Sequence, residues 1–120
     1  TFIWLTQEPQ RLSAAAHAAL DEPTNDLYLS HVSVWEIYNK CQAGKLRLPG
    51  PARVWVEEQL AARGVNDWQI DLASLGRMSE LPLHHRDPFD RLLVASALNW
   101  NATILTPDPA VHRYPVSWRW

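Results

Sequence analysis

The sequence predicts an α/β fold in which a short parallel sheet carries helices on both faces. Short apolar runs bounded by turn residues are typical of strands. Longer segments with helix-favouring residues and capping signals separate these runs. Because the two kinds of segment alternate along the chain, we expect a layered arrangement of helices around one parallel sheet.

Helix signals dominate the first half of the chain. The alanine-rich stretch after Ser13 favours helix, and the Ser13 hydroxyl is a suitable cap for its first turn. Gly44 and Gly64 each follow a helical segment, where helices commonly end. Pro51 suits the first turn of a helix. The expected elements are a short helix or turn over 2–7, a helix over 14–20, a strand over 27–29, and helices over 31–43 and 51–63.

The clearest helix start lies in the second half. Asp87 can cap a helix, and Pro88 suits its first helical position. The segment 92–98 that follows is apolar on nearly every face, which indicates a buried helix. The expected elements are a strand over 68–72, a helix over 73–81, a loop over 82–86, a helix over 87–99, and strands over 102–105 and 116–118.

Length and charge indicate one small domain without a general affinity for polyanions. The chain has 120 residues, with 11 Lys and Arg against 13 Asp and Glu and a net charge of −2. A general nucleic-acid binder would be strongly basic, so any such role must rest on a local site. Cys41 is the only cysteine, which excludes an internal disulfide and suits a reducing cytoplasm. No apolar run reaches the ~18 residues of a membrane span, and no secretory signal is visible.

The first residues of the chain are unusual for an α/β domain. Thr1 is not a methionine, and the apolar stretch 2–5 follows at once. Most such domains begin with a strand that leads into a segment of this kind. We therefore expect residues 1–120 to be a single domain that is truncated at its N-terminus.

Three acidic residues stand out by their positions. Glu36 lies early in the helix expected over 31–43, Asp90 lies in the first turn of the buried helix, and Asp108 lies just beyond the strand expected over 102–105. In an open parallel sheet, the carboxyl ends of strands and the first turns of the following helices share one edge, where ligands bind. These three carboxylates could therefore meet at that edge.

Converging carboxylates need a partner. Two of them ~4 Å apart repel by about 4 kcal/mol at an effective dielectric constant of ~20. Either one is protonated or a cation joins them, and hard oxygen ligands favour Mg²⁺ or Mn²⁺. Such an ion can activate water and stabilise charge on a phosphate. Convergence would therefore suit a metal-dependent phosphodiesterase.

Each acidic residue also has a structural interpretation. Ser33 and Glu36 match a capping box, and Glu36 and Lys40 have the spacing of a surface ion pair. Asp90 suits the positive end of a helix dipole, and Asp108 could be an ordinary turn residue. His84 and His85 adjoin this region, but consecutive side chains point to different sides, so we assign them no metal. Spacing alone does not select a nuclease.

The segment 81–98, LPLHHRDPFDRLLVASAL, closely resembles the signature of PIN-domain proteins of the VapC toxin type. In that family a strand ending in Leu-Thr-x-Asp follows, and residues 105–108 fit this pattern. Residues 30–46 resemble the helix and loop after the family's second strand. Residues 2–5 resemble the segment just after its first catalytic aspartate. The resemblance covers essentially the whole chain.

The resemblance implies a three-layer α/β/α sandwich around a short parallel sheet. It also implies an endoribonuclease that cuts RNA with Mg²⁺ or Mn²⁺ held by a small set of acidic residues. By match to the family's motifs, Glu36, Asp90 and Asp108 are the expected catalytic and metal-binding residues. The family's first strand and first acidic residue would precede Thr1. We therefore expect the chain as given to be inactive or poorly stable.

Further roles are expected around these carboxylates. Asp87 and Thr106 are expected to support the metal ligands, Thr106 through its hydroxyl. Lys40, Arg86 and Arg91 are candidates for contacts with RNA phosphates, because cations near an acidic cluster offset its repulsion of RNA.

VapC-type toxins pair with an antitoxin that blocks the site. The chain's seven tryptophans could serve that contact or a homodimer, if Trp4, Trp35 and Trp55 form one exposed patch. Two alternatives stay open. One is a PIN fold kept only for partner binding, and the other is a Mg²⁺-dependent phosphatase.

Overall fold

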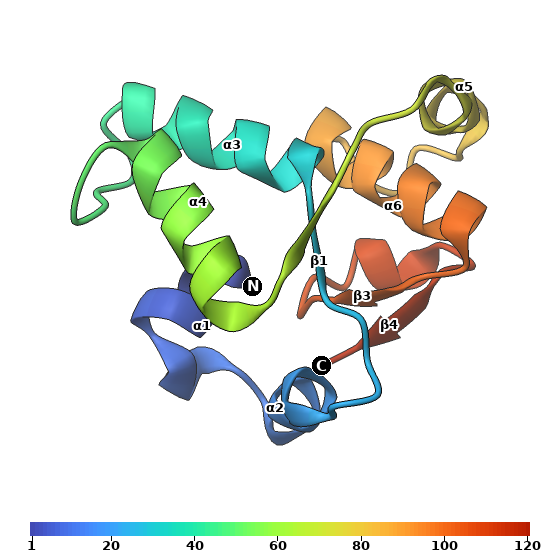
Figure 1. Cartoon of the computed structure of the whole chain (residues 1–120). Coiled ribbons are helices and arrows are strands. Elements are labelled where there is room, and N and C mark those ends of the chain that lie inside the picture. Colours follow the sequence, from blue (N-terminus) through green and yellow to red (C-terminus); the bar gives the residue numbers. More distant parts are fainter. The chain divides into compact units, whose positions relative to one another are not determined.

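The computed structural model describes residues 1–120 and contains six α-helices, two 3₁₀ helices and four short strands (Figure 1). The chain forms two compact units, one made of residues 26–69 and the other of residues 1–25 and 70–120. The elements are α1 (Phe2–Gln7), η1 (Pro9–Arg11), α2 (Ala14–Asp21), β1 (Tyr28–Ser30), α3 (His31–Gln42), α4 (Ala52–Arg63), β2 (Asn66–Trp68), α5 (Leu72–Glu80), α6 (Pro88–Trp100), β3 (Thr103–Leu105), η2 (Val111–Arg113) and β4 (Ser117–Arg119).

The unit of residues 26–69 is a parallel strand pair joined by two helices. β1 pairs in parallel with β2, with Leu29 opposite Asp67. The Ser30 side chain accepts a hydrogen bond from the backbone N–H of Val32 and so caps α3. α4 ends at Gly64, whose φ of 61° is a left-handed conformation that glycine adopts without a steric penalty. The buried apolar residues of this unit are Leu29, Val32, Ile37, Trp55 and Val56.

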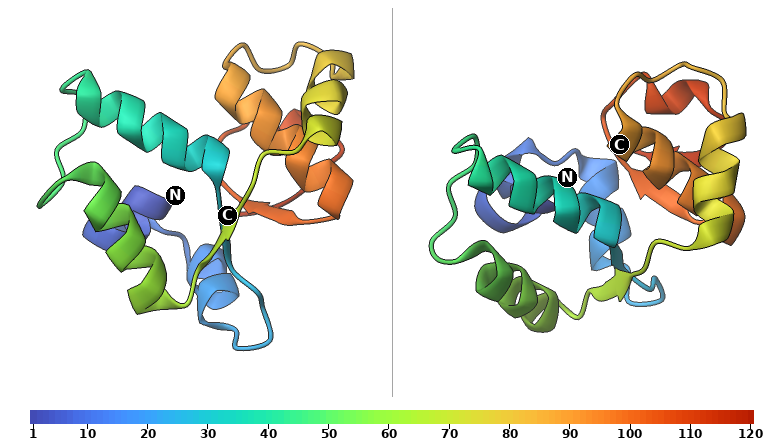
Figure 2. Two further views of the ribbon diagram at one scale, coloured as in Figure 1. Left: turned by 45° about the horizontal axis from the view of Figure 1, so that its top comes forward. Right: turned by 90° about the horizontal axis from the view of Figure 1, so that it is seen from above.

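The second unit is built around α6. α5 packs against α6, and α6 leads into β3, which pairs in parallel with β4 (Figures 1 and 2). Six of the seven residues of α6 from Arg91 to Ala97 are buried. This confirms the prediction of a buried helix. The core cluster consists of Val94, Ala97, Ile104, Val111, Tyr114 and Val116.

The α/β class and the parallel strand pairing are confirmed. The strand expected over 68–72 was placed wrongly, because β2 covers residues 66–68 and Asp71 instead caps α5. The 3₁₀ helices η1 and η2 were not predicted. The strands form two separate two-stranded sheets. The three-layer sandwich, the single domain and the missing first strand stay predictions.

None of the helices combines the length and the apolar character needed to cross a membrane.

Asp71 gives the fold a predictable response to acid. A hydrogen bond from the backbone N–H of Ser74, together with bonds from the Ser74 and Trp100 side chains, lowers the pKa of Asp71 below its ordinary value of 3.8. A carboxyl group with a lowered folded-state pKa stabilises the fold above its unfolded-state pKa, and this contribution is lost as the pH falls through the folded-state pKa.

The variant Asp71→Asn keeps a capping oxygen but loses the charge. We expect the wild type to exceed this variant in free energy of unfolding at about pH 6, and the difference to vanish below about pH 3. Urea unfolding of both proteins at a series of pH values measures this difference. An equal difference at every pH would mean that the charge of Asp71 has no part in capping α5.

Candidate functional site

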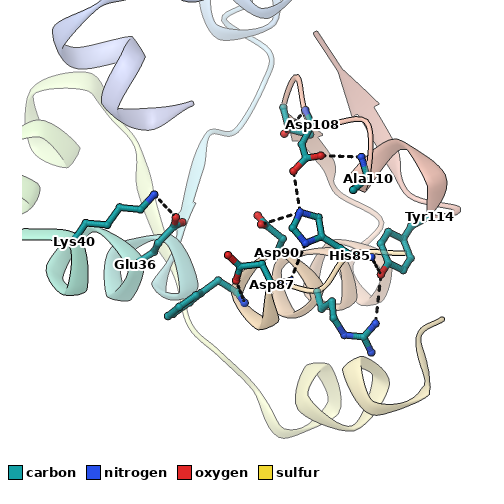
Figure 3. Close-up of polar contacts among 11 residues, drawn as sticks. Glu36, Lys40, His85, Asp87, Asp90, Asp108, Ala110 and Tyr114 are labelled. Carbon is teal, nitrogen blue, oxygen red and sulfur yellow. Dashed lines mark hydrogen bonds and ion pairs between the residues drawn. The ribbon is translucent and has the colours of Figure 1, made fainter. Parts of the chain in front are cut away.

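Two carboxylates and one imidazole meet in the unit that contains α6. Nε2 of His85 lies 2.9 Å from Oδ2 of Asp108 and 3.1 Å from Oδ2 of Asp90 (Figure 3). One potential ligand atom from each of the three residues lies within 4.8 Å of the others. The predicted convergence of Asp90 with Asp108 is therefore present in the structure, with His85 between them.

Local backbone structure positions the two carboxylates. Asp90 lies in the first turn of α6, which the Asp87 side chain caps by accepting a hydrogen bond of 2.9 Å from the N–H of Phe89. Asp108 lies just after β3, where its backbone N–H donates to Oγ1 of Thr106 at 3.1 Å. Asp108 Oδ1 accepts from the N–H of Ala110 at 2.8 Å, which leaves Oδ2 directed at His85.

His85 is held from its backbone and from its ring. Its N–H donates to the Tyr114 hydroxyl at 2.9 Å, and that hydroxyl donates to the Pro82 carbonyl at 2.8 Å. The ring Nδ1 accepts a hydrogen bond of 3.0 Å from the N–H of Asp87. Tyr114 is only 3% exposed, so the loop before α6 is anchored to the core.

Arg91 has a structural role in this loop. Its terminal nitrogens donate to the carbonyl oxygens of Met78 at 2.8 Å, Pro82 at 2.8 Å and Leu81 at 3.1 Å. The residue is only 8% exposed. A guanidinium group that is buried and bonded to backbone carbonyls through both terminal nitrogens cannot reach an RNA phosphate without breaking these bonds. The prediction that Arg91 contacts phosphate is therefore corrected.

The cluster is partly open to solvent. The side chain of His85 is 15% exposed, whereas those of Asp90 and Asp108 are 33% and 37% exposed. Burial raises the pKa of Asp108, but hydrogen bonds from His85 and Ala110, and the charges of His85 and His112 when protonated, outweigh it and lower that pKa. Asp108 is therefore a carboxylate at neutral pH and is available as an anionic ligand.

The chemistry of this donor set fits a divalent metal ion. The carboxylates of Asp90 and Asp108 could hold such an ion, because their ligand atoms are close enough to reach a common centre. Carboxylate oxygens are the preferred ligands of Mg²⁺ and are also suitable for Mn²⁺. Partial exposure of the two carboxylates keeps this centre accessible to solvent.

Glu36 lies on α3 in the other unit and forms an ion pair of 2.6 Å with Lys40, four residues later (Figure 3). The alternative capping box is wrong, because α3 begins earlier and Ser30 caps it, which places Ser33 inside the helix. The side chain of Glu36 is 34% exposed. Its convergence with Asp90 and Asp108 stays a prediction.

The residues expected to support the site or to bind partners differ in their positions and exposure. Thr106 and Asp87 both contact residues of the cluster. Oγ1 of Thr106 accepts a hydrogen bond from the N–H of Asp108, and the N–H of Asp87 donates to Nδ1 of His85. Arg86 is exposed.

Trp55 is only 6% exposed, whereas Trp35 is 53% exposed, so the expected patch of three exposed tryptophans does not exist. His85 itself received no role from the sequence, and the only signal was its place two residues before Asp87.

Comparison with known proteins finds similarity over most of the chain. The PIN domain family matches residues 1–116. The chain is also 28% identical over 117 residues to Ribonuclease VapC22 of Mycobacterium tuberculosis (strain ATCC 25618 / H37Rv). This similarity covers 93% of the chain and 86% of that protein. The resemblance to VapC-type PIN-domain proteins is therefore confirmed.

Proposed function

Because the chain belongs to the PIN domain family, we propose that it is an endoribonuclease that hydrolyses RNA phosphodiester bonds with a divalent metal ion. The observation that carries this proposal is the meeting of Asp90 and Asp108 at one partly exposed position. The similarity to a protein named as a ribonuclease supports RNA as the substrate. The resemblance to VapC-type proteins supports a role as the toxin of a toxin–antitoxin pair.

We propose that Asp90 and Asp108, together with Glu36, hold Mg²⁺ or Mn²⁺ as the catalytic residues. When bound, the ion would activate water and offset the charge that develops on the phosphate. Thr106 and the N–H of Ala110 fix the orientation of Asp108, and they thereby keep its Oδ2 on the side of Asp90. Asp87 fixes the start of α6 and with it the position of Asp90.

Two cations are proposed to guide the RNA backbone. Arg86 is exposed and lies next to His85 in sequence. The side chain of Lys40 is 53% exposed and neutralises Glu36 through their ion pair. Cationic side chains of this kind position a nucleic acid through its phosphates without reading its sequence.

The remaining partners follow from the same proposal. A cognate antitoxin would block the site. We propose that the protein forms a homodimer and that it acts in the cytoplasm. We also propose that the two units belong to one PIN domain with an α/β/α sandwich, because the family match extends across both of them.

Incubation of the full-length, antitoxin-free protein with a mixed cellular RNA pool tests this function. We expect cleavage with Mg²⁺ or Mn²⁺, its loss in a chelator, and its return when excess metal is added. Intact RNA in every condition would favour a PIN fold that serves only partner binding. Hydrolysis of small phosphate esters without RNA cleavage would instead indicate a phosphatase.

Glu36→Gln tests the predicted third ligand. We expect RNA cleavage to fall by about tenfold or more, because a neutral amide is a weaker ligand for a hard cation than a carboxylate. Glu57→Gln is the matched control, since Glu57 also pairs with a cation four residues away, at 3.1 Å from Arg53. Initial cleavage rates should separate the two variants. Equal rates in both would remove Glu36 from the site.

A further inference from the structure

We propose that the His85 ring occupies the place between Asp90 and Asp108 that the metal ion takes, so that ring and ion exclude one another. His85 is then a positioning residue that keeps the two carboxylates together before the metal binds, and it is not itself a metal ligand. This inference rests on the proposed metal-dependent function.

The first support is the position of the ring. A single nitrogen, Nε2 of His85, lies within hydrogen-bonding distance of both carboxylates, at 2.9 Å from Asp108 and 3.1 Å from Asp90. Two carboxylates that approach each other repel unless a positive or proton-donating group lies between them. The ring therefore serves the purpose that a bound cation would serve at the same point.

The second support is the location of the ring proton. A backbone N–H can only donate, so the 3.0 Å contact from the N–H of Asp87 requires Nδ1 of His85 to accept. A histidine ring whose Nδ1 accepts carries its proton on Nε2. The nitrogen that faces the carboxylates is therefore an N–H donor, and it offers no lone pair to a metal.

The third support is that the backbone of His85 is fixed while its side chain faces the cluster. The backbone N–H of His85 is fixed by the Tyr114 hydroxyl at 2.9 Å, and Tyr114 is buried. The His85 side chain is 15% exposed and faces the partly open cluster. Rotation of this side chain, with loss of the Nδ1 contact to the N–H of Asp87, would therefore vacate the position between the carboxylates while the loop stays anchored.

The fourth support is ligand preference. Mg²⁺ takes oxygen ligands and retains several waters, so a centre of two carboxylates and water suits it without a nitrogen ligand. The exclusion of His85 from the coordination sphere is therefore compatible with the metals proposed above.

Calorimetric titration with Mn²⁺ distinguishes a displaced ring from a ligand. We expect His85→Ala to bind Mn²⁺ about tenfold more tightly than the wild type, since the ion no longer replaces the hydrogen bonds of the ring. His17→Ala is the control, because it removes an imidazole from α2 in the same unit, where Nε2 of His17 lies 3.0 Å from the carbonyl oxygen of Pro9. The affinity of this control should equal that of the wild type.

The alternative results have separate meanings. Weaker Mn²⁺ binding by His85→Ala would make His85 a ligand, which overturns this inference but leaves the metal-dependent function intact. Unchanged binding would overturn the inference as well. If neither the wild type nor the variant binds Mn²⁺, the inference and the proposed metal dependence both fail.

A measurement on the wild type keeps the inference testable if His85→Ala does not fold. In the nitrogen-15 spectrum of the histidine rings, we expect Nε2 of His85 to keep its proton when Mg²⁺ is added, while its hydrogen-bond environment changes. Loss of the Nε2 proton on addition of Mg²⁺ would show direct coordination and would overturn the inference.

Discussion

Asp90→Asn should lower metal-dependent RNA cleavage at least about 100-fold, the scale seen when one group that stabilises developing charge is removed. The asparagine side chain has nearly the same shape and still presents an oxygen to Nε2 of His85, which lies 3.1 Å from Oδ2 in the wild type. What the variant loses is an anionic ligand. Initial rates on a defined RNA at saturating Mn²⁺ measure the effect.

A second aspartate variant separates this loss from a general charge effect. Asp21 is exposed at the end of α2, in the same unit as Asp90, and Asp21→Asn makes the same change of charge away from the cluster. Its cleavage rate should match the wild type. If Asp90→Asn remains folded and also cleaves RNA at the wild-type rate, the assignment of the catalytic site is wrong.

Arg91→Met should destabilise the fold by about 2–4 kcal/mol, because it leaves buried carbonyl oxygens without donors. The guanidinium of Arg91 donates to three carbonyl oxygens, those of Met78, Leu81 and Pro82, and the residue is 8% exposed. A loss of this size is a large fraction of the stability of a small domain. Urea unfolding monitored by tryptophan fluorescence measures it.

Arg53→Met is the matched control for this prediction. Arg53 lies on α4 with a side chain that is 74% exposed, and its partner is Glu57. An exposed pair of this kind contributes at most about 1 kcal/mol, so the control should be close to the wild type. A stable Arg91→Met that binds RNA more weakly would return Arg91 to the phosphate contacts.

The sequence predicted the features that depend on local signals. Asp87 predicts a helix cap and Pro88 predicts the first helical residue. α6 begins at these positions, and the Asp87 side chain accepts a hydrogen bond from the N–H of Phe89. Asp90 was placed correctly in the first turn by the same signal. Asp108 lies three residues after the end of β3, so the alternation of strands and helices was enough to bring it toward Asp90.

The features that sequence reasoning missed depend on contacts between distant segments. His85 acquires its position from Tyr114, 29 residues later, and from Asp108 beyond β3. Arg91 looked like a surface cation because nothing local shows that carbonyl oxygens of the preceding loop surround it. β2 has the sequence Asn-Asp-Trp, of which only Trp68 favours a strand, and it forms through backbone pairing with β1.

A metal site formed by Asp90 and Asp108 is tested most directly by the position of a bound ion in crystals grown with Mn²⁺. We expect one anomalous difference peak between Asp90 and Asp108, about 2.1 Å from a carboxylate oxygen of each. A strong peak elsewhere on the protein, with none between these two side chains at saturating Mn²⁺, would contradict it.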